Sequence, residues 1–122
     1  MTKEEFSRLV SEAVHWVIEQ CGQEPINLVV EVIEKASQAD DEAVSRGAIA
    51  FFIGYTRHEQ DLGLSGQVIM LPSRIAFIQD RIEACIENQK LELSAFLRNV
   101  AIHELAHYFG ISHERMQELG VG

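Results

Sequence analysis

The chain has 122 residues, of which 47% are hydrophobic, and it carries 10 Lys and Arg against 19 Asp and Glu. This length fits one domain over residues 1–122 and makes a second domain improbable on size alone. The formal net charge of −9 argues against a nucleic-acid-binding surface, which needs clustered Lys and Arg. Any catalytic site in so short a chain must be built from very few residues.

The N-terminal residues, the lengths of the apolar runs and the two cysteines indicate the cellular compartment. Residues 1–5 are too acidic for a signal peptide, and no run approaches the ~18 apolar residues of a membrane span. The two cysteines, Cys21 and Cys85, are far apart and form no Cys-x-x-Cys pair. We therefore expect a cytoplasmic protein with reduced cysteines and no membrane partner.

The first half of the chain begins with an expected helix over residues 2–21, which opens with the capping pattern Thr2-x-x-Glu5. Alternating apolar residues predict a strand over residues 26–33. Residues 36–46 have the composition of an exposed acidic loop, and the apolar run 48–55 predicts a buried strand.

The second half continues with a turn, expected at Gly63, Ser65 and Gly66. Residues 68–71 and 75–78 predict two short strands that are separated at Pro72, where a hydrogen-bond donor is missing. Helices are expected over residues 81–88 and 91–109, followed by a last helix from a Ser112 cap to Leu119, with Gly120 after it. The order predicts an α+β fold with an N-terminal helix, a small mixed three- to four-stranded sheet and a C-terminal helix that carries the site.

The candidate site lies in residues 103–113, which read HELAHYFGISH. On a helix, His103 and His107 are one turn apart on the same face, so both imidazoles can reach one ion. Glu104 is close enough in this arrangement to act on water that a metal activates. The spacing therefore predicts a metal-dependent hydrolytic site.

Gly110 and His113 complete the pattern. Gly110 allows the chain to leave the helix and double back, so that His113 becomes a third ligand while a fourth position stays open. An open position distinguishes a catalytic zinc site from a structural one. The residues around the motif are apolar on nearly every side, and Phe96 and Val100 extend the histidine face, so we expect this face to lie against the sheet.

Residues 103–113 match the metzincin zinc signature, His-Glu-x-x-His-x-x-Gly-x-x-His. Together with residues 71–77, 81–84 and 100–120, they make the chain resemble the bacterial minimal zincins, a zincin-like metallopeptidase domain once catalogued as a domain of unknown function. The resemblance implies a zincin-like fold and a zinc-dependent peptidase with one Zn²⁺ per chain. By matching position, it implies His103 and His107 as ligands, Glu104 as the general base and His113 at the third-ligand position.

Two positions depart from the related families. Members of the minimal zincin family often have an acidic or small polar residue where this chain has His113. True metzincins have a methionine turn well beyond the third histidine, whereas Met116 follows His113 closely and within an expected helix. We therefore assign no methionine beneath the metal.

The leading hypothesis is hydrolysis of a peptide or protein substrate by zinc-activated water, with Glu104 as general base. An edge strand over residues 74–79 would align the substrate, whereas Tyr108 is interpreted as a packed side chain and not an oxyanion donor. One alternative is a metal-binding regulatory module without turnover. The other is a zinc-dependent endoribonuclease with the same histidine spacing, which Glu104 and the charge of −9 disfavour. The oligomeric state stays open.

Overall fold

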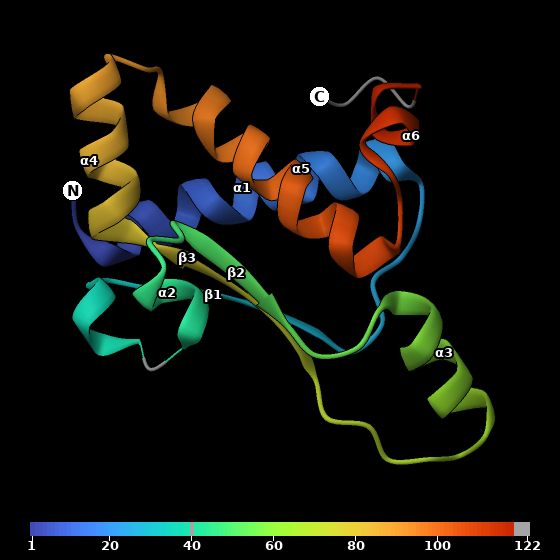
Figure 1. The fold of residues 1–122 in the computed structure, drawn as a ribbon. Helices are drawn as coiled ribbons and strands as arrows, with labels where there is room; N and C mark the ends of the chain where they lie inside the picture. Colours follow the sequence, from blue (N-terminus) through green and yellow to red (C-terminus); the bar gives the residue numbers. More distant parts are fainter. Residues whose placement is uncertain (40, 119–122) are drawn as a thin grey trace.

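The computed structural model describes residues 1–39 and 41–118, except for the side chain of His113. These residues form six α-helices, a short 3-10 helix and three strands, which confirms the predicted α+β class. Helices α1 (Lys3–Cys21) and α5 (Leu93–Phe109) lie together over one face of the sheet, and α2 (Glu42–Ser45) lies on the other face (Figure 1). In the part of the chain described, no helix combines the length and apolar character needed to cross a membrane.

Helix α1 forms as its sequence predicts. The Thr2 hydroxyl accepts a hydrogen bond from the backbone N–H of Glu5 at 3.1 Å, which satisfies a donor that the first turn leaves unpaired. The helix ends where Gly22 adopts a left-handed conformation with φ 67°. Its buried face packs against α5 and lies in the main hydrophobic core.

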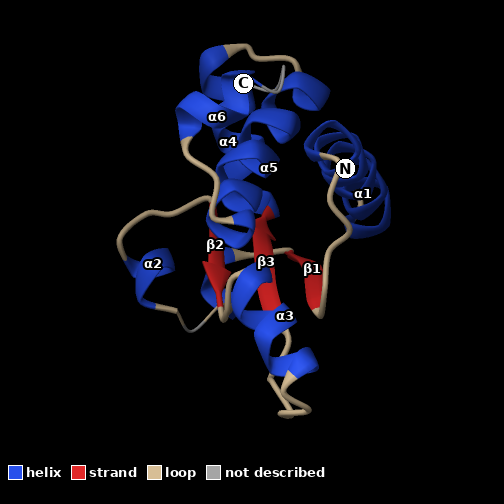
Figure 2. Ribbon diagram, turned by 90° about the vertical axis from the view of Figure 1, so that its right-hand side faces the viewer, coloured by secondary structure: helices blue, strands red, loops and turns tan. Residues whose placement is uncertain are grey.

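The sheet has three strands in the order β1-β3-β2, with bounds Leu28–Ile33 for β1, Ala50–Ile53 for β2 and Ser73–Ile78 for β3 (Figure 2). Strand β1 runs parallel to β3 and β2 runs antiparallel to it, so the sheet is mixed as predicted. The expectation that residues 74–79 form an edge strand is wrong, because β3 has a hydrogen-bonded neighbour on each side.

The two apolar runs on either side of Pro72 have different structures. The run after it forms β3, and Ile75 is fully buried. Residues 68–71 form no strand, and the side chain of Ile69 is 98% exposed. The predicted fourth strand is therefore absent from the described residues. The run lies instead against a helix, since the N–H of Val68 donates to the C=O of Gly63 at 2.8 Å.

That helix, α3 (Arg57–Ser65), includes Gly63 and Ser65, so the expected turn is wrong at these two residues and is confirmed only at Gly66, directly after the helix. Thr56 and Glu59 form a capping box at its start, a signal that the sequence reading did not use. Gly63 lies inside the helix, and Met70 packs over it so closely that a Cβ there would come within 2.4 Å of the Met70 Cγ.

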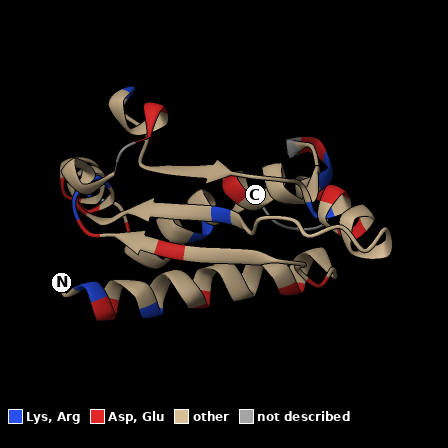
Figure 3. Ribbon diagram, turned by 90° about the horizontal axis from the view of Figure 1, so that it is seen from below, with Lys and Arg blue, Asp and Glu red and all other residues tan. Residues whose placement is uncertain are grey.

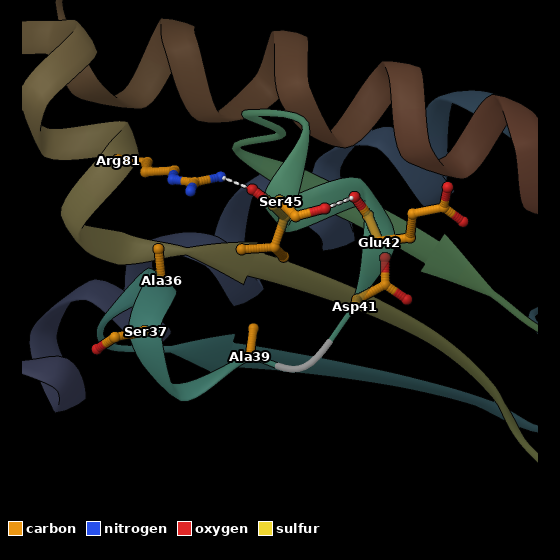
Figure 4. Close-up of a pocket in the computed structure, with 8 residues that line it drawn as sticks. Ala36, Ser37, Ala39, Asp41, Glu42, Ser45 and Arg81 are labelled. Atoms are coloured by element: carbon orange, nitrogen blue, oxygen red, sulfur yellow. Dashed lines mark hydrogen bonds between the residues drawn. The ribbon is translucent and has the colours of Figure 1, made fainter.

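Residues 36–46 are also more structured than the exposed acidic loop that was predicted. They form a 3-10 helix, Ala36–Gln38, and helix α2. Val44 is buried with Phe51, Ala76 and Ile78 on the face of the sheet opposite α5, and this burial orders the segment. Arg81 reaches toward this segment from α4 (Gln79–Gln89) and donates to the backbone oxygens of Val44 and Ala48, beside an open cavity of about 390 Å³ (Figure 4).

Candidate metal centre

Helix α5 carries the first two histidines and the glutamate of the motif. It begins after Glu92, whose carboxylate accepts hydrogen bonds from the backbone N–H groups of Ala95 and Ser94, and these bonds lower the pKa of Glu92 below its ordinary range. It ends before Gly110, as predicted. Its orientation is fixed by eight buried side chains: Leu97, Val100, Ala101, Ile102, Leu105, Ala106, Tyr108 and Phe109.

His103 and His107 lie on the exposed strip of this helix. Exposed positions recur at every fourth residue, at Ala95, Asn99, His103 and His107, which is the spacing of one helical face. The prediction that this face lies against the sheet is therefore wrong. Helix α5 packs on both α1 and the sheet, and its apolar residues face these two surfaces. The two histidines therefore lie on the strip of the helix that faces solvent.

A cavity of about 340 Å³ opens beside the two histidines. His103, Ala106 and His107 line it from α5, and residues 110–112 line it from the turn that follows. The turn reverses because Gly110 is left-handed, with φ 66°, and the N–H of Ile111 donates to the C=O of Ala106 at 3.0 Å. The structure thus confirms the change of direction that was predicted at Gly110.

Glu104 is half-buried, one position after His103. Burial raises the pKa of its carboxyl above the ordinary value, because removal of water disfavours the charged form. The charge of His107 acts in the opposite direction and lowers the same pKa by a smaller amount. Glu104 is therefore partly withdrawn from solvent but electrostatically linked to a candidate ligand.

Helix α6 (His113–Glu118) starts directly after the cavity turn. The hydroxyl of Ser112 accepts a hydrogen bond from the N–H of Arg115 at 3.1 Å, so the predicted cap is confirmed, while the predicted end at Leu119 and Gly120 lies outside the described residues. Met116 is buried, and its Sδ lies 3.9 Å from the Sγ of Cys21 in α1. This contact attaches α6 to the core.

The structure brings together part of the predicted ligand set. His103 and His107 share one cavity, whereas the His113 side chain is outside the described part of the chain. Among the side chains that are described, no group of three or more His, Cys, Asp or Glu is placed to hold a metal ion. The role of His113 as third ligand therefore stays a prediction.

Tyr108 is packed, as predicted. Its side chain is fully buried and its hydroxyl is hydrogen-bonded to the backbone of Ile26, so it is not directed into the cavity as an oxyanion donor would be. Sequence reasoning missed two features here: the bond to Ile26 and the presence of Ile111 and Ser112 in the cavity wall. The bond to Ile26 has no local signal, because it joins positions 82 residues apart. The place of Ile111 and Ser112 follows from the reversal at Gly110, which is a local signal.

Residues 26–122, which are more than half of the chain, match the family model of the zincin-like metallopeptidases. The chain belongs to the zincin-like metallopeptidase family. The match includes the whole 103–113 motif and begins after α1, although α1 packs directly on the motif helix. No match was found among curated proteins.

Family membership indicates a zinc-dependent peptidase that acts on peptide or protein substrates. The residues of this zincin-like metallopeptidase fit that metal in their chemistry. Imidazole nitrogen is a regular zinc ligand, and the exposed strip presents two imidazoles at the helical spacing that a single ion requires. The cavity beside them also leaves room for a substrate group, as a catalytic site must.

Proposed function

We propose that this zincin-like metallopeptidase hydrolyses peptide bonds at one zinc ion held by His103, His107 and His113, with Glu104 as general base. The observation that carries the proposal is the common cavity of His103 and His107, with a half-buried glutamate between them in sequence. This combination is what a zinc-dependent peptidase needs.

Zinc, when bound, supplies a Lewis acid that polarises the scissile carbonyl and lowers the pKa of water. Glu104 takes the proton from the attacking water and later delivers it to the leaving amine. His103 and His107 keep their relative position because they belong to one helix whose other faces are buried.

The strand that aligns the substrate is β2 in this proposal, not β3. Strand β2 pairs with β3 on one side only, and in the described residues no strand pairs with its other side. It also contacts α5, since the Phe52 ring packs edge-on against Tyr108 at 6.3 Å between centroids. An extended peptide can therefore add to this edge by main-chain hydrogen bonds close to the motif helix.

The Glu104→Gln variant tests the general base. We expect it to retain zinc and to lose peptide hydrolysis by about 10²–10⁴-fold, because general acid–base catalysis contributes this range. Glu87→Gln, at an exposed position of α4, is the matched control and should retain full activity. Unchanged turnover of a peptide library by Glu104→Gln would contradict the role of Glu104.

Elemental analysis tests the ligand set. Protein purified without added metal should hold about one zinc per chain, and His113→Ala should hold less or bind it more weakly. The same zinc content and affinity in His113→Ala would remove His113 from the set. Zinc binding by a wild-type protein that cleaves no member of a broad peptide library would instead support the regulatory-module alternative.

The endoribonuclease alternative finds no support in the charge distribution. Lys and Arg are dispersed singly among acidic residues in the part of the chain that the structure describes (Figure 3). Electrostatic binding of a phosphate backbone depends on several cations acting together. RNA binding at physiological salt would nevertheless revive that alternative, and a filter-binding assay measures it directly.

A further inference from the structure

Tyr108, next in sequence to His107, connects the motif helix to a segment 82 positions away. Its phenol oxygen accepts a hydrogen bond from the N–H of Ile26 and donates one to the C=O of the same residue, both at 2.6 Å. Its ring packs edge-on against Phe52 and Phe109, with centroids 6.3 and 5.1 Å away. The side chain thus satisfies both backbone groups of one residue from inside the core.

The segment that Tyr108 bonds is itself held in place. Ile26 lies in the connection between α1 and β1, and the C=O of Glu24 in this connection accepts a hydrogen bond from the Nε of Arg57 at 2.7 Å. Arg57 is the first residue of α3. The bond from Tyr108 therefore ties α5 to a connection that a third element also fixes.

The hydrogen bonds of the Tyr108 hydroxyl to Ile26 affect the direction of the His107 side chain through the geometry of the helix. Successive side chains on an α-helix are about 100° apart, so the direction of a buried residue determines the direction of its exposed neighbour. Burial of an aromatic ring is favourable over a range of helix rotations because the hydrophobic effect is non-directional. Two hydrogen bonds to one backbone residue restrict that range, because they require defined distances and angles.

We propose that Tyr108 is a positioning residue of the metal centre: its hydroxyl fixes the rotation of the last turn of α5 and thereby directs His107 into the cavity. This inference rests on the proposed zinc site. It assigns the Tyr108 hydroxyl a role in metal affinity beyond its contribution to folding, and it requires no contact between Tyr108 and the metal.

The Tyr108→Phe variant of the full chain tests the inference, because it removes the hydroxyl and keeps the ring. Zinc affinity is measured by competition with a chromophoric chelator, and the visible spectrum of the Co²⁺-loaded protein reports ligand geometry. Under conditions where circular dichroism shows both proteins fully folded, we expect Tyr108→Phe to bind zinc about tenfold more weakly, as for other residues that orient ligands. The Co²⁺ bands should shift in position or intensity.

Two control variants separate positioning from general destabilisation. Tyr55→Phe removes the hydroxyl of an exposed tyrosine, and Ile78→Val removes one methylene from the fully buried cluster on the opposite face of the sheet. Ile78→Val lowers the stability of the fold by opening a small cavity in that cluster, away from α5. Both controls should keep wild-type zinc affinity and the wild-type Co²⁺ spectrum.

Unchanged zinc affinity and an unchanged Co²⁺ spectrum in Tyr108→Phe overturn the inference. An equal loss of zinc affinity in Ile78→Val also overturns it. If Tyr108→Phe fails to fold, Arg57→Gln is used instead. This variant removes the hydrogen bond from Arg57 to the C=O of Glu24, which holds the same connection between α1 and β1. A loss of about twofold or more in zinc affinity there supports the inference, and no loss overturns it. A wild-type protein that binds no zinc overturns the proposed function itself, so the two failures are distinguishable.

Discussion

The 103–113 motif extends over two helices that are attached to the molecule in different ways. Helix α5 is 17 residues long and is held by eight buried side chains. Helix α6 has six residues, of which Met116 is fully buried against the end of α1. The elements of a protein differ in the free energy of local opening according to how much apolar surface each buries. The two α5 histidines thus have a rigid support, whereas His113 begins an element with a single apolar anchor among its described side chains.

A pair of alanine variants gives the largest effect that we expect. Leu105→Ala, in the buried face of α5, should lower the free energy of unfolding by about 2–5 kcal/mol and destabilise the whole molecule. Met116→Ala should lower it less, because α6 can detach without unfolding the sheet, but amide exchange in α6 should accelerate strongly. Denaturant unfolding and hydrogen exchange measure the two effects. Equal losses of global stability would show that α6 is as firmly integrated as α5.

Gly110→Ala affects the junction between the two helices and should have an intermediate effect. An added Cβ meets no atom within 4 Å, so the cost arises from the positive φ alone and amounts to roughly 1–2 kcal/mol. Gly22→Ala, at the same position after α1 with φ 67°, is the matched control. Both variants should lose similar stability in thermal unfolding, but only Gly110→Ala should also weaken zinc binding. Equal zinc affinities of the Gly110→Ala and Gly22→Ala variants would contradict the role of the Gly110 turn in the site.

Glu92→Gln tests the start of α5 and should have the smallest effect. The folded-state pKa of Glu92 is lowered, so its contribution to stability is fully present above the unfolded-state pKa and is lost as pH falls through the folded-state value. The melting temperature of the variant should be lower than that of the wild type at pH 7, and the difference should vanish in acid. Glu87→Gln is the control. A difference that persists at low pH would mean that the carboxylate charge is not what caps the helix.

The sequence predicted the elements whose signals are local. Thr2 and Gly22 delimit α1, and Gly110 ends α5, because capping and left-handed backbone depend on neighbouring residues only. Helix α3 is an exception, because its capping box at Thr56 and Glu59 is a local signal, although Gly63 and Ser65 within it are residue types typical of a turn. The other errors occurred where a distant contact decides the structure. Residues 68–71 have the composition of a strand, but no described strand pairs with them.

For the candidate site, the sequence by itself determined the spacing of the candidate residues. His103 and His107 are four positions apart with Glu104 directly after His103, and 3.6 residues per turn places the two histidines on one face of a helix. Only the tertiary structure decided that this face is open to solvent, that β3 is central and β2 an edge, and that the Tyr108 hydroxyl bonds Ile26. The physical reason is that helix geometry is local, whereas exposure and strand order depend on which remote apolar surfaces pack together.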